Sequence, residues 1–387
     1  MSTRIYLDNA ATSYPKPEQV YTAVDRYQRE LGVAVGRGAT RTGNEVSRTV
    51  RSARKRLAEL LGAESPDRII FTSNGTDSLN LAIHGLLQPG DHVVSSEMEH
   101  NSVLRPLAWL QEHRGIDVTF VSADSSGQID PSDVRDAICP ETKLIALTHA
   151  SNVTGTLQPL ADFCEIARTA RVRLLIDAAQ TAGVVPIDLR QTPIDLLACP
   201  GHKGLLGPLG TGVLYVKPGV EEELQSIRQG GTGSVSELQS QPETLPDKYE
   251  SGNHNAPGLF GLEAGLTYIQ KRTIPSIRQH EQALLEQLLD GFRAIDGLQI
   301  HGPNDPSRQI GIVSVTVDGF EPQILSSILD ESFQIQTRAG LHCAPGVHRQ
   351  MGTSDFGGTV RFSVGPMTTE NDIETTILAM TEILQSS

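Results

Sequence analysis

Seven short apolar runs, separated by helical segments, restrict the fold of this chain more than any other feature. Strands buried on both faces read as nearly continuous apolar runs, and their alternation with helices is typical of a mainly parallel sheet. We therefore predict an α/β fold with a mainly parallel seven-stranded sheet. Its strands are expected at residues 68–72, 92–95, 118–121, 143–148, 173–176, 196–200 and 211–216.

The chain of 387 residues exceeds one typical domain, and its last third changes character. A polar, proline-containing loop runs to Asn255, and helical segments and short strands follow it, which indicates a smaller α+β domain. We predict a large domain over 16–256 and a small one made of 1–15 plus 257–387. Helices are expected over 17–31, 46–61, 79–87, from 102 onward, and over 257–271 and 277–295, and the short strands over 310–317 and 359–363.

Composition limits which binding partners and which cellular compartment we expect for the protein. A formal net charge of −14 argues against nucleic acid or an anionic membrane as the main partner. The first residues hold no apolar region long enough for a signal peptide, and no apolar run approaches the ~20 residues of a membrane span. The four cysteines form no CxxC pair or disulfide framework, so we expect a reducing, cytoplasmic setting.

Polar residues follow the predicted strands at the points where those strands end. In open parallel sheets, ligands bind beyond the carboxyl ends of the strands. Side chains from many strands are therefore expected to meet in one site, which is the strongest physical signal in the sequence. They are Thr76, His100, Asn152, Asp177, Gln180, His202 and Lys203.

Lys203 suggests what that site holds. It follows a buried strand, where an ammonium group costs several kcal/mol unless it is paired or neutralised. A Schiff base to an aldehyde cofactor neutralises it, and pyridoxal 5'-phosphate (PLP) is the common case. A solvated loop lysine beside glycines is the alternative.

The segment from Gly75 to Ser78 lies between a predicted strand and a predicted helix, which is a ready anion site. An ordinary helix N-cap by Thr76, Asp77 or Ser78 is the alternative, and the two can coexist. Arg37 and Arg41, in the glycine-broken loop 32–43, could also face an anion or simply lie in a solvated loop.

Other residues suit the remaining needs of PLP. Asp177 suits the pyridine nitrogen, because a carboxylate keeps it protonated. His100 could stack on the ring and move protons, while Asn152 and Gln180 are candidate partners of the phenolic oxygen. His202, with Thr76, could contact the phosphate. Taken singly, such residues are more often turn, cap or hydrogen-bonded residues.

A second group of candidate functional residues surrounds Cys343, within residues 337–345. A neighbouring histidine or arginine favours a reactive thiolate. An inert core cysteine is the alternative, and we assign that role to Cys139, Cys164 and Cys199. A metal site with His342 and His348 matches no zinc spacing. Arg361 lies in an apolar run, where a buried guanidinium needs a carboxylate partner. That partner is either the α-carboxylate of an amino-acid ligand or a side chain in a structural ion pair.

In combination, the sequence resembles the class V aminotransferase-like, fold-type I PLP enzymes, and within them the SufS-like cysteine desulfurases and selenocysteine lyases. The resemblance runs nearly end to end, and the ordered set of motifs is highly specific for the superfamily. The motifs are Tyr6 to Thr12, Gly75-Thr76, Glu99-His100, Ser151 to Gly155, Asp177 to Gln180, Gly201-His202-Lys203, Arg338 to Ala344 and Val360 to Ser363.

The resemblance implies that Lys203 holds PLP, with the contacts proposed above for Asp177, His100, Asn152, Gln180, Gly75, Thr76 and His202. It implies that Arg361 grips the substrate carboxylate with Arg338 nearby, and that Asn152 also binds the substrate. It also implies a homodimer in which the partner's residue at position 253, an asparagine here, completes the phosphate site.

The activity implied is conversion of L-cysteine to L-alanine. The Cys343 thiolate takes the sulfur as a persulfide, and a sulfur-acceptor protein is a possible further partner. A selenocysteine lyase, a C–S lyase or a class V aminotransferase-like enzyme acting on another amino acid is the alternative. Three positions depart from the SufS-like pattern and leave the substrate open: Pro200 replaces a usual serine, Leu341 a usual histidine, and Gly36 an expected histidine.

Overall fold

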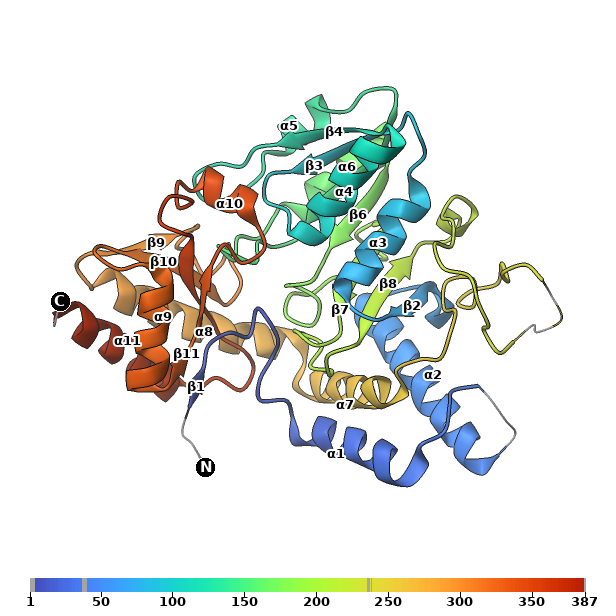
Figure 1. The fold of residues 1–387 in the computed structure, drawn as a ribbon, viewed down its shortest axis with the longest axis horizontal. Coiled ribbons are helices and arrows are strands. Elements are labelled where there is room, and N and C mark those ends of the chain that lie inside the picture. Colours follow the sequence, from blue (N-terminus) through green and yellow to red (C-terminus); the bar gives the residue numbers. More distant parts are fainter. Residues whose placement is uncertain (1–3, 37–39, 235–236, 238, 386–387) are drawn as a thin grey trace.

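A computed structural model describes residues 4–36, 40–234, 237 and 239–385, and a seven-stranded sheet forms its centre (Figure 1). The strand order is β2-β8-β7-β6-β5-β3-β4, and only β8 runs against its neighbours. The predicted mainly parallel α/β sheet is therefore confirmed. The strands are β2 (Ile69–Thr72), β3 (His92–Ser96), β4 (Asp117–Val121), β5 (Thr142–Thr148), β6 (Arg173–Asp177), β7 (Leu196–Pro200) and β8 (Gly212–Val216).

Alternate residues of these strands pack into two separate cores, one on each face of the sheet. Ile176 belongs to one core and its neighbour Leu175 to the other, as the two-residue period of a strand requires. Helices α3 (Gly75–Leu86) and α4 (Asn101–Arg114) cover one face. The other is covered by α2 (Arg41–Leu61), α5 (Pro131–Asp136), α6 (Leu160–Ala170) and α7 (Ala256–Arg272).

The C-terminal part builds a smaller antiparallel sheet with the order β12-β13-β10-β9. Its own core also takes Ile5 and Leu7 from the start of the chain, where β1 (Ile5–Tyr6) pairs with β11 (Ile335–Gln336). The domain boundaries predicted above stay a prediction. The remaining elements are β9 (Leu298–His301), β10 (Ile312–Val317), β12 (Arg338–Gly340), β13 (Thr359–Ser363), α8 (Ile274–Arg293), α9 (Pro322–Phe333), α10 (Pro345–Gln350) and α11 (Glu370–Gln385).

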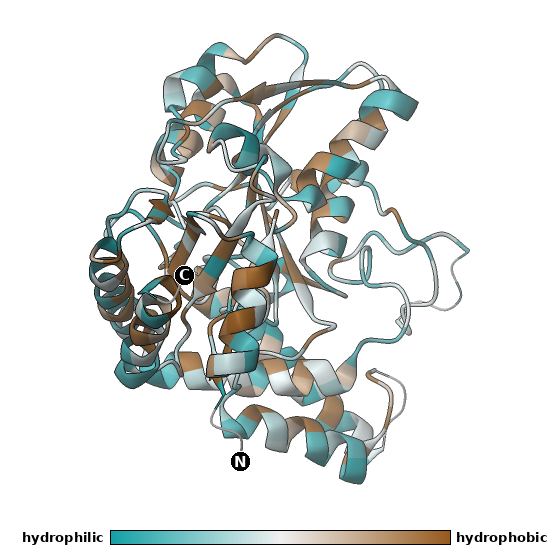
Figure 2. Ribbon diagram, turned by 60° about the vertical axis from the view of Figure 1, so that its left-hand side comes forward, coloured by the Kyte–Doolittle hydropathy of each residue, from teal (hydrophilic) through white to brown (hydrophobic). Residues whose placement is uncertain are grey.

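Apolar residues gather on the strands of the sheets, whereas the long segment between β8 and α7 is mostly hydrophilic (Figure 2). That segment also contains the short 3-10 helix Val220–Glu222. None of the described helices is long and apolar enough to cross a membrane.

The start of one helix, α2, differs from the predicted start because a capping side chain sets it. Helix α2 begins at Arg41, well before residue 46, since Thr40 Oγ1 accepts a hydrogen bond from the Gly43 N–H at 3.0 Å. Arg41 is therefore a helical residue, and Arg37 lies outside the described residues. Toward the N-terminus, α1 (Glu18–Arg26) continues as a π-helical turn, Tyr27–Leu31, which ends at Gly32.

Candidate active site

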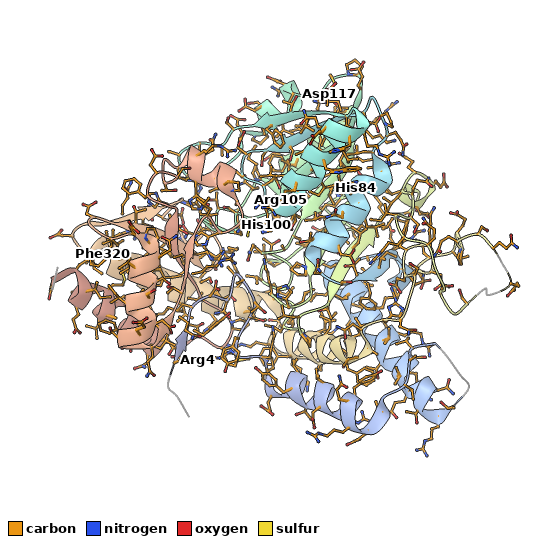
Figure 3. The ribbon with its side chains drawn as sticks, in the orientation of Figure 1. Arg4, His84, His100, Arg105, Asp117 and Phe320 are labelled. Carbon is orange, nitrogen blue, oxygen red and sulfur yellow. The ribbon has the colours of Figure 1, made fainter. Side chains whose placement is uncertain are left out.

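A cavity of about 220 Å³ lies beyond the carboxyl ends of β3, β5, β6 and β7. Figure 3 places His100 beside this region, between the helices of the large sheet and the smaller sheet. The cavity brings together most of the residues predicted from the sequence. Those that line it are Gly75, Thr76, His100, Asn152, Asp177, Gln180, His202, Lys203, Arg338 and Arg361.

Lys203 lies three residues beyond the end of β7, whose residues are all buried. Enclosure by the protein lowers the pKa of its amine to about 8, and Arg361 adds to the effect while the Asp177 carboxylate opposes it. A larger share of the amine is therefore neutral at physiological pH than for an exposed lysine. A neutral amine is the form that attacks an aldehyde.

Asp177 is the last residue of β6 and is buried. Burial raises the pKa of its carboxyl, while the hydrogen bond from the Ala179 N–H (2.8 Å to Oδ1) and the charge of Lys203 oppose that rise. A protonated ring nitrogen would stabilise the charged form of this buried carboxylate.

The N-terminus of α3 opens into the same cavity. Asn74 caps the helix by accepting from the Asp77 N–H at 2.9 Å, so the alternative considered above, an N-cap by Thr76, Asp77 or Ser78, is wrong. A Cβ atom at Gly75 would lie 3.1 Å from Pro200 Cδ, a tight contact that glycine avoids. Nearby, His202 Nδ1 is buried without a hydrogen-bond partner among the described residues. A helix N-terminus and an unpaired imidazole nitrogen suit a phosphate group.

His100 is fixed by Ser102, a residue that the sequence analysis missed. His100 Nδ1 accepts from the Ser102 N–H at 3.0 Å and lies 2.9 Å from the Ser102 hydroxyl. That hydroxyl is also 2.7 Å from Thr76 Oγ1. Burial, reinforced by the charge of Lys203, lowers the pKa of His100 to about 4, so the ring is neutral at pH 7.

Asn152 and Gln180 line the cavity and also hold neighbouring segments. Asn152 Nδ2 donates to the carbonyl oxygen of His342 at 2.6 Å, and Gln180 Nε2 donates to that of Ala10 at 3.1 Å. An amide nitrogen carries two protons, so each side chain keeps one for another acceptor. Contact with a phenolic oxygen stays a prediction for both.

Arg361 is 1% exposed and has a carboxylate partner within the chain. Its Nη2 donates to Asp8 Oδ1 at 2.6 Å and its Nη1 to the Asn152 carbonyl oxygen at 2.9 Å. The structural ion pair considered above therefore exists. Within the part of the chain that the structure describes, Arg361 Nε is nevertheless buried without a hydrogen-bond partner, and the side chain lines the cavity. A role toward a substrate carboxylate therefore stays a prediction. Asp8 is a second residue that the sequence analysis did not assign to the site.

Cys343 lies at the rim, not in the cavity. It follows β12 and is exposed, with φ of 60°, directly after His342 with φ of 48°. Two successive non-glycine residues in the left-handed region mark a strained turn. Arg338 Nη2 lies 3.7 Å from Cys343 Sγ, whereas His342 Nε2 lies 3.0 Å from Thr359 Oγ1.

The other cysteines have different surroundings. Burial raises the pKa of Cys164 to about 11 and that of Cys199 to about 12, so both stay protonated. Cys139 is only half-buried, beside Thr142, which corrects the expectation that it lies in the core. Within the described residues, no group of three histidine, cysteine or acidic side chains could hold a metal ion.

Asn253 does not line the cavity. It is exposed in the loop between β8 and α7, beside His254 and Ser251. Of the three departures from the SufS-like pattern, Pro200 lines the cavity next to Gly75, while Leu341 is 42% exposed. Gly36 is not among the residues that line the cavity.

These residues fit PLP, which needs an amine, a carboxylate for the ring nitrogen, an anion cradle and a flat group over the ring. Lys203, Asp177, the start of α3 with His202, and His100 provide these groups around one cavity. The unpaired His202 Nδ1 is the observation that points most directly to a missing anionic group.

Comparisons with known proteins agree with this geometry. The family model "Aminotransferase class-V" matches residues 5–376. A probable cysteine desulfurase of Methanothermobacter thermautotrophicus is 36% identical over 374 residues, or 96% of this chain and 92% of that protein. A cysteine desulfurase of Haloferax volcanii is 33% identical over 90% of this chain and 83% of that protein.

Solved structures give the same answer. The apo structure of a cysteine desulfurase from Thermococcus onnurineus superposes with a TM-score of 0.93 at 32% identity, covering 99% of this chain and 95% of that one. This chain therefore belongs to the class-V aminotransferase family, with the fold-type I architecture, and is a PLP-dependent enzyme of the cysteine desulfurase kind.

Proposed function

We propose that this enzyme converts L-cysteine to L-alanine and receives the sulfur on Cys343 as a persulfide. The observation that carries the proposal is the placement of an exposed thiol at the rim of the cavity that holds Lys203 and Arg361. The Arg338 side chain lines that cavity and also reaches Cys343 Sγ, so it links the two.

Bound PLP supplies an aldehyde that captures amines and a ring that withdraws electrons from the bonds of a captured amino acid. Lys203 would hold it through the ε-amine, and Asp177 would pair with the ring nitrogen. The first turn of α3, with Thr76 and His202, would bind the phosphate.

The substrate would be oriented by its carboxylate. The guanidinium of Arg361 is held in place by Asp8 and by the Asn152 carbonyl oxygen, which fixes the direction of its remaining N–H groups. Arg338 lies nearby as a second cation. Lys203 and His100 are the proton carriers of the cavity, because both are held neutral to a greater degree than in water.

Sulfur transfer then needs Cys343 as a thiolate. Its Sγ attacks the sulfur of the bound cysteine, the Cβ–S bond breaks, and protonation of the carbon skeleton leaves alanine. One cysteine and one thiol give one alanine and one persulfide, so atoms and electrons balance without an external oxidant or reductant.

Two further parts of the proposal concern the oligomeric state and the cellular compartment. We infer a homodimer in which Asn253 completes the phosphate site of the partner, supported by its exposed position outside the cavity of its own chain. All four cysteines are free, which supports a reducing, cytoplasmic setting.

The test is a product assay. Purified enzyme with PLP is given L-cysteine and a reductant, alanine and sulfide are quantified, and an absorbance spectrum is recorded on the same sample. Alanine and sulfide in equal amounts are expected. A yellow enzyme that makes no alanine from cysteine would contradict the proposal, and alanine from selenocysteine alone would replace it with a lyase.

A further inference from the structure

A small cavity of about 40 Å³ adjoins the Lys203 cavity on the side of the smaller antiparallel sheet. Its lining comes from residues after β6 and β7, from α8, and from the adjoining ends of β10 and β13. It shares Ala10, Gln180 and Lys203 with the larger cavity, and we call it the inner cavity. Its polar lining residues are Asn9, Ser13, Gln180, Lys203, Glu281 and Ser363.

Glu281 is a lining residue of the inner cavity to which the proposed reaction gives no role. It lies in α8 and is 3% exposed. Within the described chain, its carboxyl group takes part in no hydrogen bond or ion pair. Its Oε2 atom lies 3.6 Å from the position that a Cβ atom on Gly311 would occupy, and Gly311 also lines the inner cavity. A buried carboxyl group without a protein partner needs water to satisfy it.

The inner cavity has the size and the polarity that ordered water requires. One water molecule needs roughly 10–15 Å³ of such space, so the cavity has room for a few. The Gln180 amide and the Ser363 hydroxyl offer hydrogen-bond partners in addition to Lys203 and Glu281. Water in the inner cavity would therefore connect the Glu281 carboxyl group with the Lys203 amine.

Of the described residues that line the inner cavity, Lys203 and Glu281 are the two that ionise. Arg278, one turn earlier in α8, donates to the carbonyl oxygens of Pro306 and Gln309 at 3.1 and 2.6 Å. Burial outweighs the charge of Arg278 and raises the pKa of Glu281 to about 8. Burial also lowers the pKa of Lys203 to about 8. Two groups with similar pKa values exchange a proton in either direction at little cost in free energy.

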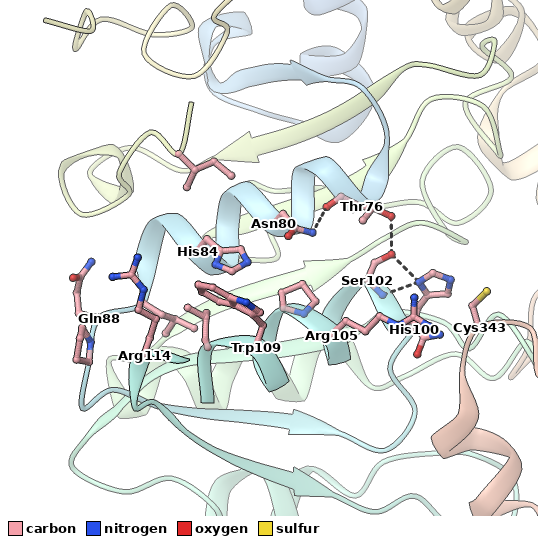
Figure 4. A pocket seen from close by; sticks show the side chains of 16 residues that line it. Thr76, Asn80, His84, Gln88, His100, Ser102, Arg105, Trp109, Arg114 and Cys343 are labelled. Carbon is pink, nitrogen blue, oxygen red and sulfur yellow. Dashed lines mark hydrogen bonds between the residues drawn. The ribbon is translucent and has the colours of Figure 1, made fainter. Parts of the chain in front are cut away.

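His100, the other proton carrier of the Lys203 cavity, is a less suitable store for this proton. Its ring is fixed by hydrogen bonds to Ser102, whose hydroxyl also contacts Thr76 (Figure 4). Burial lowers the pKa of His100 to about 4, far below that of Lys203. A proton therefore moves from Lys203 to His100 only at a large cost in free energy.

We propose that Glu281 stores a proton for Lys203 and exchanges it through water in the inner cavity. The inference rests on the proposed function, because it needs Lys203 as the group that moves the protons of the bound amino acid. Glu281 acts through the water and Lys203 and does not itself touch the substrate.

The step is a proton transfer without oxidation or reduction. Lys203 takes a proton from the α-carbon of the bound amino acid and becomes an ammonium group. One N–H bond of that group then breaks, each water molecule gains one proton and loses another, and an O–H bond forms on the Glu281 carboxylate. The reverse steps return the proton to Lys203, which delivers it to the carbon skeleton. The number of protons is conserved, and no other reactant is needed.

Infrared spectra of the resting holoenzyme test the store without turnover. Difference spectra between wild type and Glu281→Gln isolate the carbonyl band of a protonated Glu281 from those of other carboxyl groups. The band is expected near pH 7, should shift when D₂O replaces H₂O, and should disappear as the pH rises above about 8. Glu286→Gln, at an exposed position of α8, is the matched control and should keep the band.

Turnover of three variants tests the link to Lys203. Glu281→Gln keeps the shape of the side chain but cannot take a proton. The kcat for alanine formation should therefore fall at least about tenfold, with an unchanged KM for cysteine and an unchanged visible spectrum of bound PLP. Glu281→Asp keeps an acid, and water can fill the space of the lost methylene, so it should lose less than about threefold. Glu286→Gln should behave as wild type. If Glu281 served packing alone, glutamine, the closer match in shape, would be the milder substitution.

A Glu281 band that is absent near pH 7, or one that does not respond to D₂O, overturns the proposal. An undiminished kcat in Glu281→Gln, or a lower kcat in Glu281→Asp than in Glu281→Gln, overturns it as well. If the wild-type enzyme binds PLP but forms no alanine from cysteine, the proposed function fails. The infrared result alone then supports or overturns the exchange of a proton between Glu281 and the water of the inner cavity.

Discussion

Lys203 and Cys343 belong to one proposed reaction, but they lie in opposite environments. Lys203 is enclosed at the carboxyl end of a fully buried strand, where its surroundings lower its pKa to about 8. Cys343 is exposed on a loop of the smaller sheet, in a left-handed backbone conformation, with one long contact to Arg338. The difference teaches that cofactor capture depends on a rigid, desolvated cavity, whereas sulfur removal depends on an accessible thiol. The two should therefore be separable by substitution.

The largest effect is expected from Lys203→Ala. Without the ε-amine the cofactor has no covalent anchor, so activity should fall by about 10³-fold or more. Borohydride treatment should fix PLP to the wild-type peptide containing Lys203 and to no peptide of the variant. A variant that keeps a borohydride-fixed cofactor would show that another amine serves as the anchor.

Cys343→Ser should lose at least about 10²-fold in alanine formation while keeping the visible spectrum of bound PLP. The exposed loop can lose its thiol without disturbing the cavity, because Cys343 does not line it. Cys139→Ser is the control and should behave as wild type. Undiminished alanine formation in Cys343→Ser would mean that sulfur leaves without attack by this thiol.

Arg361→Lys tests the grip on the substrate carboxylate. Loss of a charged hydrogen bond of about 1.5–3 kcal/mol predicts a rise in KM for cysteine of about ten- to a hundredfold, with a smaller change in kcat. If Arg361 served only the ion pair with Asp8, the variant would instead lose thermal stability at an unchanged KM.

The pH dependence of cofactor capture follows from Lys203. The neutral amine reacts, so the rate at which apoenzyme captures pyridoxal should rise with pH and reach half its maximum near pH 8. Asp177 raises the pKa of Lys203, so Asp177→Asn should move the midpoint to lower pH. A midpoint near the ordinary lysine value of 10.5, or an upward shift in the variant, would contradict this account.

The smallest effect is expected from Leu341→Ala, beside Cys343. Leu341 is 42% exposed, so the free energy of unfolding should change by no more than about 0.5 kcal/mol. Leu197, fully buried in β7, is the contrasting position, and Leu197→Ala should cost about 2–5 kcal/mol. Denaturant unfolding of both variants measures the difference, and a large cost at Leu341 would show that the loop is packed more tightly than its exposure indicates.

The sequence predicted the sheet and the cavity well, because apolar strands and the polar residues at their ends are local patterns. Asp177 ends a strand, and Lys203 and His100 follow the ends of two others by three and four residues; topology brings such ends together. Their meeting in one cavity was therefore predictable.

The contacts that the sequence did not indicate are long-range or depend on side-chain direction. Asp8 and Arg361 form an ion pair although they are 353 residues apart in the sequence, and no local sequence pattern predicts such a pair. Ser102 has the sequence context of an ordinary residue in the first turn of a helix, yet it holds His100 and Thr76. Asn74, and not one of the residues after it, caps α3, because the conformation of the turn before the helix determines which side chain points at the free N–H groups.

The most direct measurement is the location of the sulfur after a single addition of L-cysteine to the holoenzyme. Cleavage after Arg338 and Arg349 yields a peptide that contains Cys343 and no other cysteine. Mass spectrometry under non-reducing conditions should find one added sulfur atom on this peptide and none on those containing Cys139, Cys164 or Cys199. Alanine formation with the sulfur on another cysteine would contradict the assignment of the exposed thiol as the sulfur carrier.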